Sequence, residues 1–206
     1  KSDYPLPARR LQAQTKTDKA SVIFGPEIKT EANIILDRIV SANPEQYLYI
    51  GNQLVNFSYK TNVMIANAGK DLRIRNILPL TFQGVGDIEE LNFLDICDVK
   101  GNIYVFAIIN DKKDKTMSLY KLTLDPEELV ASTPQKLGVV NYDFTRATNV
   151  KKFELTLSPD SSKILIFYPA PYKKGMPERF GAMVFDENMN IIWANEFQLP
   201  YPDDYF

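Results

Sequence analysis

The stretch that decides the fold runs Phe153-Glu154-Leu155-Thr156-Leu157-Ser158-Pro159-Asp160-Ser161-Ser162-Lys163-Ile164-Leu165-Ile166-Phe167. Its first five residues alternate between apolar and polar, which is typical of a strand with one face in water. Serine, proline and aspartate then favour a tight turn, because proline presets φ and the other two bond to nearby backbone. The four apolar residues at the end predict a buried strand. The stretch therefore predicts two antiparallel strands joined by a turn.

The same order recurs at a spacing of about sixty residues, first over Leu36–Ile50 and then over Phe93–Phe106. A later hairpin keeps the spacing, since Asp125 and Asp186, each placed after a strand pattern, are 61 residues apart. A fixed period of this length indicates stacked supersecondary units.

Each repeat contains four strand patterns, and four strands joined as an antiparallel meander form the blade of a β-propeller. The sequence predicts an all-β, propeller-like fold with about three four-stranded antiparallel blades, at about residues 33–82, 91–142 and 150–201. Fourth strands are expected at 72–75, 137–140 (with 129–130) and 191–197. Residues 1–20 predict an extended tail ahead of a propeller-like domain at 21–206. Only residues 125–129 suggest a helical turn.

Three blades are fewer than the four to eight with which propellers close. An open row would leave two exposed sheet edges, which promote aggregation. We therefore expect the chain to be the N-terminal part of a larger propeller, whose further blades come from the same gene or from another chain.

The segment from Leu155 to Phe167 resembles the repeat of TolB-like and related bacterial propellers, in which a strand leads into a Ser-Pro-Asp-Gly turn and a strand that begins with lysine. Here Ser161 stands in place of the glycine. The fuller pattern, from about residue 24 to 201, is similar to secreted or surface-attached propellers of bacterial cell envelopes. The resemblance implies an extracytoplasmic location and brings no catalytic residue with it.

Composition excludes several kinds of chemistry. The 206 residues include no histidine and one cysteine, Cys97, which rules out histidine-based catalytic triads and the usual zinc and iron–sulfur sites. A net charge of −2 provides no basic field for nucleic acid. The longest apolar run, Ile103–Ile109, is too short to span a membrane. We therefore predict no cofactor, no nucleic-acid partner and no membrane span, and place Cys97 in the core.

Carboxylates are the remaining candidates for catalysis, because glycosidases need only two of them. The candidates are Asp87, Glu89, Glu90, Asp95 and Asp98. A solvated loop followed by the polar face of a strand explains them more simply, so no catalytic residue is predicted.

Residues 186–190, Asp-Glu-Asn-Met-Asn, match the first half of a calcium loop. Ile191 replaces the required glycine, however, and Phe197 replaces the bidentate glutamate. A hairpin tip prefers the same residues, so no metal site is predicted.

The long loop after the second strand of the third repeat is the candidate binding surface. It combines aromatic and cationic side chains, which can bind sugars, peptides or an anionic partner. The predicted binding residues are Tyr168, Tyr172, Lys173, Lys174, Arg179 and Phe180. An ordinary loop stiffened by its prolines is the alternative.

The sequence favours a non-catalytic binding or scaffold module of the cell envelope, with an envelope protein or a surface glycan as its partner. The first alternative is the N-terminal part of a propeller hydrolase acting on glycans or peptides, with catalytic residues largely outside this chain. The second is a structural subunit that completes its propeller with another chain. Whether the chain has enzymatic activity stays open, and no activity is the simpler expectation.

Overall fold

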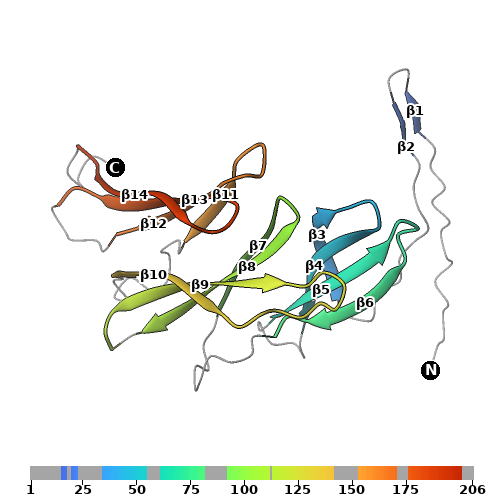
Figure 1. Ribbon diagram of the computed structural model, residues 1–206, viewed down its shortest axis with the longest axis horizontal. Coiled ribbons are helices and arrows are strands. Elements are labelled where there is room, and N and C mark those ends of the chain that lie inside the picture. The colour runs from blue at the N-terminus through green and yellow to red at the C-terminus, as the bar shows by residue number, and fades with distance from the viewer. Residues whose placement is uncertain are drawn as a thin grey trace, which may run out of the picture.

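The computed structural model describes residues 15–17, 20–22, 34–54, 61–81, 92–111, 113–141, 153–170 and 176–200. Three four-stranded antiparallel sheets lie side by side in chain order (Figure 1). The first comprises β3 (Ile34–Ala42), β4 (Gln46–Leu54), β5 (Thr61–Gly69) and β6 (Ile74–Pro79). The second comprises β7 (Asn92–Val99), β8 (Asn102–Asp111), β9 (Thr116–Leu124) and β10 (Gln135–Asn141). The third comprises β11 (Glu154–Leu157), β12 (Ile164–Pro169), β13 (Arg179–Phe185) and β14 (Ile191–Gln198).

In each of these sheets the spatial order of the strands equals their chain order, so each sheet is a meander made from one stretch of sequence. The first strands of the sheets lie near one another, β3 beside β7 and β7 beside β11. Meander sheets that pack face to face, with their first strands together, have the arrangement of propeller blades. The predicted fold class, all-β and propeller-like with three four-stranded blades, is confirmed.

The second sheet lies between the other two, and its strand β8 supplies both interfaces. Odd-numbered residues from Ile103 to Ala107 belong to the apolar cluster shared with the first sheet. Even-numbered residues from Tyr104 to Ile108 belong to the cluster shared with the third. Successive side chains of a strand point to opposite faces, which explains why residues 103–109 of β8 are apolar without interruption. Burying each large aliphatic side chain contributes about 1.5–3 kcal/mol.

An apolar residue with left-handed backbone recurs in the hairpin between the third and fourth strands of each four-stranded sheet. Leu72, Leu129 and Met189 have φ values of 61°, 57° and 66°. Leu129 is buried in the cluster between the first and second sheets, and Met189 in the cluster between the second and third. Leu129 and Met189 therefore each extend from their own sheet into the interface with the preceding sheet, and we call them plug residues. The burial offsets a backbone cost of about 1–2 kcal/mol.

Hydrogen bonds hold the same hairpins to the preceding sheet. The buried Asn67 on β5 donates from Nδ2 to the carbonyl oxygens of Pro126 at 3.1 Å and Glu127 at 3.0 Å. Tyr104 on β8 donates from Oη to the carbonyl oxygen of Glu187 at 3.2 Å. Both interfaces thus combine a plug residue with a side-chain donor from the preceding sheet.

Strand β3 is bulged twice against β4, and Gly51 is paired with Leu36 at the first bulge. A Cβ atom at position 51 would lie 2.3 Å from the carbonyl oxygen of Ile35. Only glycine allows the two backbones to approach this closely. The bulges bend β3 along the stretch that faces β7.

The strands differ from the sequence prediction at two of the hairpins. The fourth strand of the first sheet begins at Ile74 rather than at residue 72, because Leu72 has the left-handed backbone conformation. Residues 129 and 130 belong to the loop before β10 for the same reason. The helical turn considered at 125–129 is a single turn, closed by a bond from Leu129 N to Asp125 O at 2.9 Å.

Part of the predicted tail at residues 1–20 forms a small hairpin. Within it, β1 (Thr15–Thr17) pairs antiparallel with β2 (Ala20–Val22), and Figure 1 shows this hairpin apart from the three sheets. The other residues of that segment lie outside the described part of the chain.

Candidate functional site

A cavity of about 270 Å³ opens where the first strands of the three sheets meet. It is lined by residues 38–40 of β3, 95–98 of β7, 155–157 of β11 and Ile164 of β12. We call it the axial cavity. Its apolar wall comes from β11 and β12, and its polar wall from β3 and β7.

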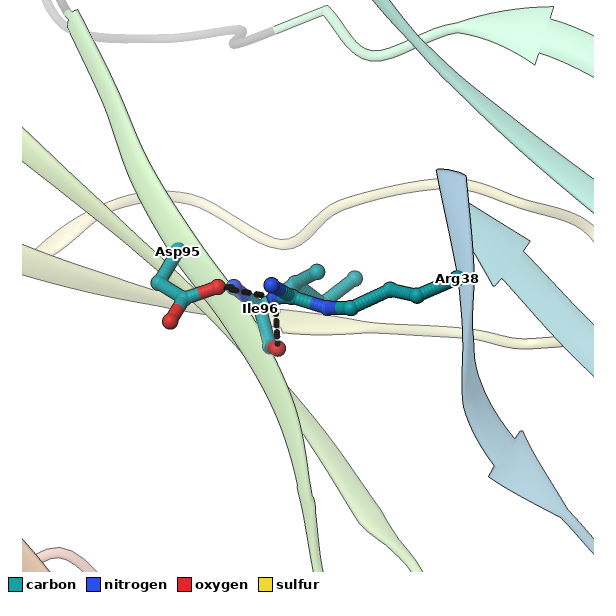
Figure 2. Close-up of polar contacts among 3 residues, drawn as sticks. All are labelled: Arg38, Asp95 and Ile96. Atoms are coloured by element: carbon teal, nitrogen blue, oxygen red, sulfur yellow. Dashed lines mark hydrogen bonds and ion pairs between the residues drawn. The ribbon is translucent and has the colours of Figure 1, made fainter. Parts of the chain in front are cut away.

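Two polar pairs join β3 to β7 at this cavity. Arg38 donates from Nη2 to the carboxylate of Asp95 and, at 3.2 Å, to the carbonyl oxygen of Ile96, as Figure 2 shows. Ser41 Oγ donates to Oδ2 of Asp98, whose Oδ1 accepts the backbone N–H of Gly101 at 2.7 Å. Both carboxylates are therefore used to hold the second sheet to the first. The Arg38–Asp95 pair is partly exposed and contributes about 1 kcal/mol or less.

Cys97 lies between these two carboxylates in the sequence and lines the same cavity. Burial, and secondly the charges of Asp95 and Asp98, raise the pKa of its thiol to about 12 against the opposing effect of Arg38. The side chain also packs against the apolar cluster between the second and third sheets. A thiol with this pKa is protonated at neutral pH and is not an activated nucleophile.

The five carboxylates considered for catalysis divide into two groups. Asp87, Glu89 and Glu90 lie outside the described residues. Asp95 and Asp98 are half-buried rather than solvated, since each faces a donor on β3. Sequence reasoning missed those donors. The signal for them was the repeat itself, because each pair is separated by 57 residues, close to one period.

The residues of the predicted binding loop do not share one face of the third sheet. Tyr168 pairs with Gly181 and Phe180 with Pro169, so that the two rings point to opposite faces. Arg179 is exposed at the start of β13, while Tyr172, Lys173 and Lys174 lie outside the described residues. That this loop binds a partner stays a prediction.

Tyr168 lies over the glycine that it faces. A Cβ atom at Gly181 would be 2.0 Å from the Tyr168 ring, and the ring also contacts Phe153 with a centroid distance of 5.8 Å. Burial, and secondly the charge of Glu196, raise the pKa of Tyr168. The tyrosine therefore has a structural role on the inner face of the sheet.

Phe180 belongs to an apolar surface on the opposite face. Its ring lies 5.1 Å from the rings of Phe167 and Phe197, the latter in a stacked arrangement, and Trp193 lies 5.8 Å from Phe197. Leu165 is on the same face, because it pairs with Val184, which pairs with Trp193. We call Leu165, Phe167, Phe180, Trp193 and Phe197 the aromatic surface. Leu165, Trp193 and Phe197 are 40%, 44% and 36% exposed.

In the hairpin considered as a calcium loop, the carboxylate of Asp186 accepts hydrogen bonds from the hairpin itself. Asp186 accepts hydrogen bonds from the backbone N–H groups of Asn188 and Asn190 at 2.9 and 2.8 Å and from Nδ2 of Asn190 at 3.0 Å. These bonds, led by that of the Asn190 side chain, lower the pKa of Asp186. Among the described residues, no group of three or more cysteines and carboxylates is arranged to hold a metal ion.

No family model matches this sequence, and no curated protein matches it. Solved structures that are similar to it in fold include the following two. The β-propeller domain of the Trilobed protease from Pyrococcus furiosus is 17% identical, with a TM-score of 0.42 over 80% of this chain and 43% of that one. The acylaminoacyl peptidase of Pyrococcus horikoshii is 12% identical, with a TM-score of 0.46 over 80% of this chain and 25% of that one.

The chain thus spans less than half the length of either solved structure. At these TM-scores the likenesses carry no argument about function, and the fold assignment rests on the sheets themselves. No helix in the described ranges is long and apolar enough to cross a bilayer.

Proposed function

We propose that this chain is a non-catalytic binding or scaffold module of the bacterial cell envelope, working outside the cytoplasm. The observation that carries the proposal is the aromatic surface of the third sheet. Contiguous exposed apolar surface marks interaction sites on soluble proteins, and aromatic residues are enriched in interfaces between proteins. The envelope location rests on the resemblance of residues 155–167 to TolB-like repeats.

The composition of the aromatic surface favours a protein partner over a glycan. Phe180 and Phe197 stack on each other, so their ring faces are partly used within the sheet. The aliphatic side chains of Leu165 and Val184 lie on the same face. This makes a broad apolar surface of the kind that another protein covers.

The polar groups of the axial cavity support a structural role for that site. Arg38 and Ser41 engage Asp95 and Asp98, and the Cys97 thiol is held protonated. Using these groups in a reaction would break polar pairs that join the second sheet to the first.

The alternative, the N-terminal part of a propeller hydrolase acting on glycans or peptides, is favoured by one observation. Asp95 and Asp98 line a single cavity, and two carboxylates are sufficient for glycoside hydrolysis. Under this alternative, Asp95→Asn and Asp98→Asn would abolish hydrolysis of glycans by the protein. Unchanged hydrolysis in both variants would remove these two residues from the mechanism.

Site-specific photocrosslinking tests the binding role. A benzophenone amino acid replaces Leu165 in the aromatic surface, and in a control protein it replaces the exposed Thr133 of the loop before β10. We expect illumination in a native envelope preparation to give a discrete adduct from position 165 and none from position 133. The adduct should disappear with Phe197→Asp. Absence of any protein adduct, or equal adducts from both positions, would reject the proposal, and capture of a glycan in its place would correct the partner.

A further inference from the structure

The two interfaces between the sheets are built alike, and each has a direction. The face of the second sheet that carries Ile103 and Leu124 packs on the first sheet, and the face of the third sheet that carries Ile164 and Phe185 packs on the second. We call this the trailing face of a sheet and the opposite one its leading face. In both interfaces a trailing face, with its plug residue, covers the leading face of the sheet before it.

The first sheet has a trailing face of the same construction that no described sheet covers. Tyr47 and Tyr49 pair there with Ala68 and Ala66, opposite the residues that pack on the second sheet. Ile39, which pairs with Tyr49, is 53% exposed. Leu72 has the backbone conformation of a plug residue and is half-buried, unlike its buried counterparts in the other two sheets.

The third sheet has a leading face that no described sheet covers, and this face is the aromatic surface. Leu165 and Phe167 occupy the positions on β12 that Tyr104 and Phe106 occupy on β8, where both residues are buried by the third sheet. The described part of the chain therefore has one uncovered face of each kind, and the two kinds are those that pair within it.

We propose that a second copy of this chain covers both faces, with the trailing face of the first sheet of each copy packed on the aromatic surface of the other. The inference rests on the proposed binding role of that surface and names its partner. The interface is heterologous and closes after two copies. The resulting ring has six sheets, within the range of four to eight in which propellers close.

Charge supports a second copy as the occupant. Residues 34–54 and 61–81, which form the first sheet, contain four basic and three acidic side chains, a net charge of +1. Residues 153–170 and 176–200, which form the third, contain two basic and six acidic side chains, a net charge of −4. The head-to-tail arrangement brings opposite charges together, whereas pairing two third sheets would bring like charges together.

Light scattering on the purified full chain after size-exclusion chromatography tests the proposal. We expect the mass of a dimer. Ile39→Asp on the trailing face and Phe197→Asp on the aromatic surface should each give a monomer that keeps the native β-sheet circular dichroism. Val139→Asp should stay dimeric, because Val139 is exposed to a similar degree but lies in the sheet whose two faces are covered.

Mixing the two monomeric variants gives the decisive result. Each retains one intact face of a different kind, so the mixture should form a dimer through a single interface. A dimer that tolerates Ile39→Asp would show pairing of two aromatic surfaces and overturn the proposal, as would a wild-type monomer or open-ended oligomers. If the chain is a monomer and position 165 still forms an adduct with another protein, the proposal that the partner is a second copy is overturned. The proposed binding role of the aromatic surface then remains in place.

Discussion

Arg38 and Ser41 show how a single residue gains its partner from the repeat. Asp95, the acceptor of Arg38, and Asp98, the acceptor of Ser41, each lie 57 residues after their donor. Equivalent positions of neighbouring sheets therefore meet near the axis. An alternating strand pattern predicts that such residues are polar and face away from a core. It does not predict that the next sheet supplies their partners, because that depends on how the two sheets are packed.

Cys97 should be nearly inert in the folded protein. With a thiol pKa of about 12, roughly one molecule in ten thousand carries the thiolate at pH 8, against roughly a quarter for an unperturbed cysteine. We expect iodoacetamide to label the native chain at least a hundredfold more slowly than the chain unfolded in urea, as followed by mass spectrometry.

The raised pKa of Cys97 also makes the free energy of unfolding fall as the pH rises in the alkaline range. The folded state favours the protonated thiol, so its contribution to stability is complete below the unfolded pKa of about 8.5 and is lost as the pH rises toward 12. Cys97→Ala should therefore weaken the loss of stability in alkaline solution. Rapid labelling of the native protein at pH 8 would contradict this account of the site.

Gly51→Ala should destabilise the first sheet. The new Cβ would meet a backbone oxygen at 2.3 Å, and a backbone atom in a paired strand cannot move away as a side chain can. We expect a loss of about 1–3 kcal/mol in the free energy of unfolding, measured by urea denaturation. Gly101→Ala is the control without a steric clash, because no atom lies within 4 Å of a Cβ at that position. Its only cost comes from the backbone strain of alanine at φ 88°.

At the scale of the element, the hairpin between the third and fourth strands is the device that joins one sheet to the next. Its plug residue fills the interface, and its backbone carbonyls accept bonds from the preceding sheet. A leucine or methionine with positive φ is unfavourable in isolation. At Leu129 and Met189 the conformation is explained by the place that the interface offers to the side chain, and Leu72 has the same backbone conformation.

Asn67→Ala should weaken the interface between the first and second sheets. The substitution removes the buried side-chain amide that donates to the carbonyl oxygens of Pro126 and Glu127 and accepts from the N–H of Asn76, which costs about 1–3 kcal/mol of unfolding free energy. Tyr104→Phe removes one bond, to Glu187 O, and keeps the buried ring, so we expect a smaller loss of about 0.5–1.5 kcal/mol.

Chemical denaturation of the two variants beside the wild type checks this order. If Tyr104→Phe were the more destabilising change, the bond of the tyrosine to the third sheet would matter more than the paired bonds of the asparagine.

The sequence predicted most strands because their apolar periodicity is local. The buried run of β8 and the Ser-Pro-Asp turn before β12 are examples. It did not predict the left-handed residues, since a leucine such as Leu129 looks like the start of a strand until its φ is known. It also grouped Tyr168 with Phe180, which the pleat of the sheet sends to opposite faces. Sequence proximity does not contain that information, because the register across the hairpin decides it.

At the scale of the whole molecule, protection from solvent decreases from the centre to the rim. Strand β8 is buried on both faces, whereas every residue of β14 is exposed. Amide hydrogen exchange should follow this order, because the amides of β8 can exchange only when the packed sheets separate.

We expect the amides of Val105, Phe106 and Ala107 to exchange more slowly than those of β14 by factors of about 100 or more, as measured by NMR. Strand β10 is the matched control, since it is the outer strand of the same sheet as β8 and is mostly exposed. It should exchange rapidly. Equal protection of β8 and β10 would mean that the second sheet opens as one unit instead of from its rim.

In the described part of the chain, every sheet pairs only strands that follow one another directly, and each plug residue reaches no further than the adjoining sheet. A tandem duplication or deletion of one whole segment of about sixty residues would consequently leave all other strand pairings intact. Such an event would disturb only the contact at its junction. Genes that encode this architecture can therefore change the number of their modules in single steps.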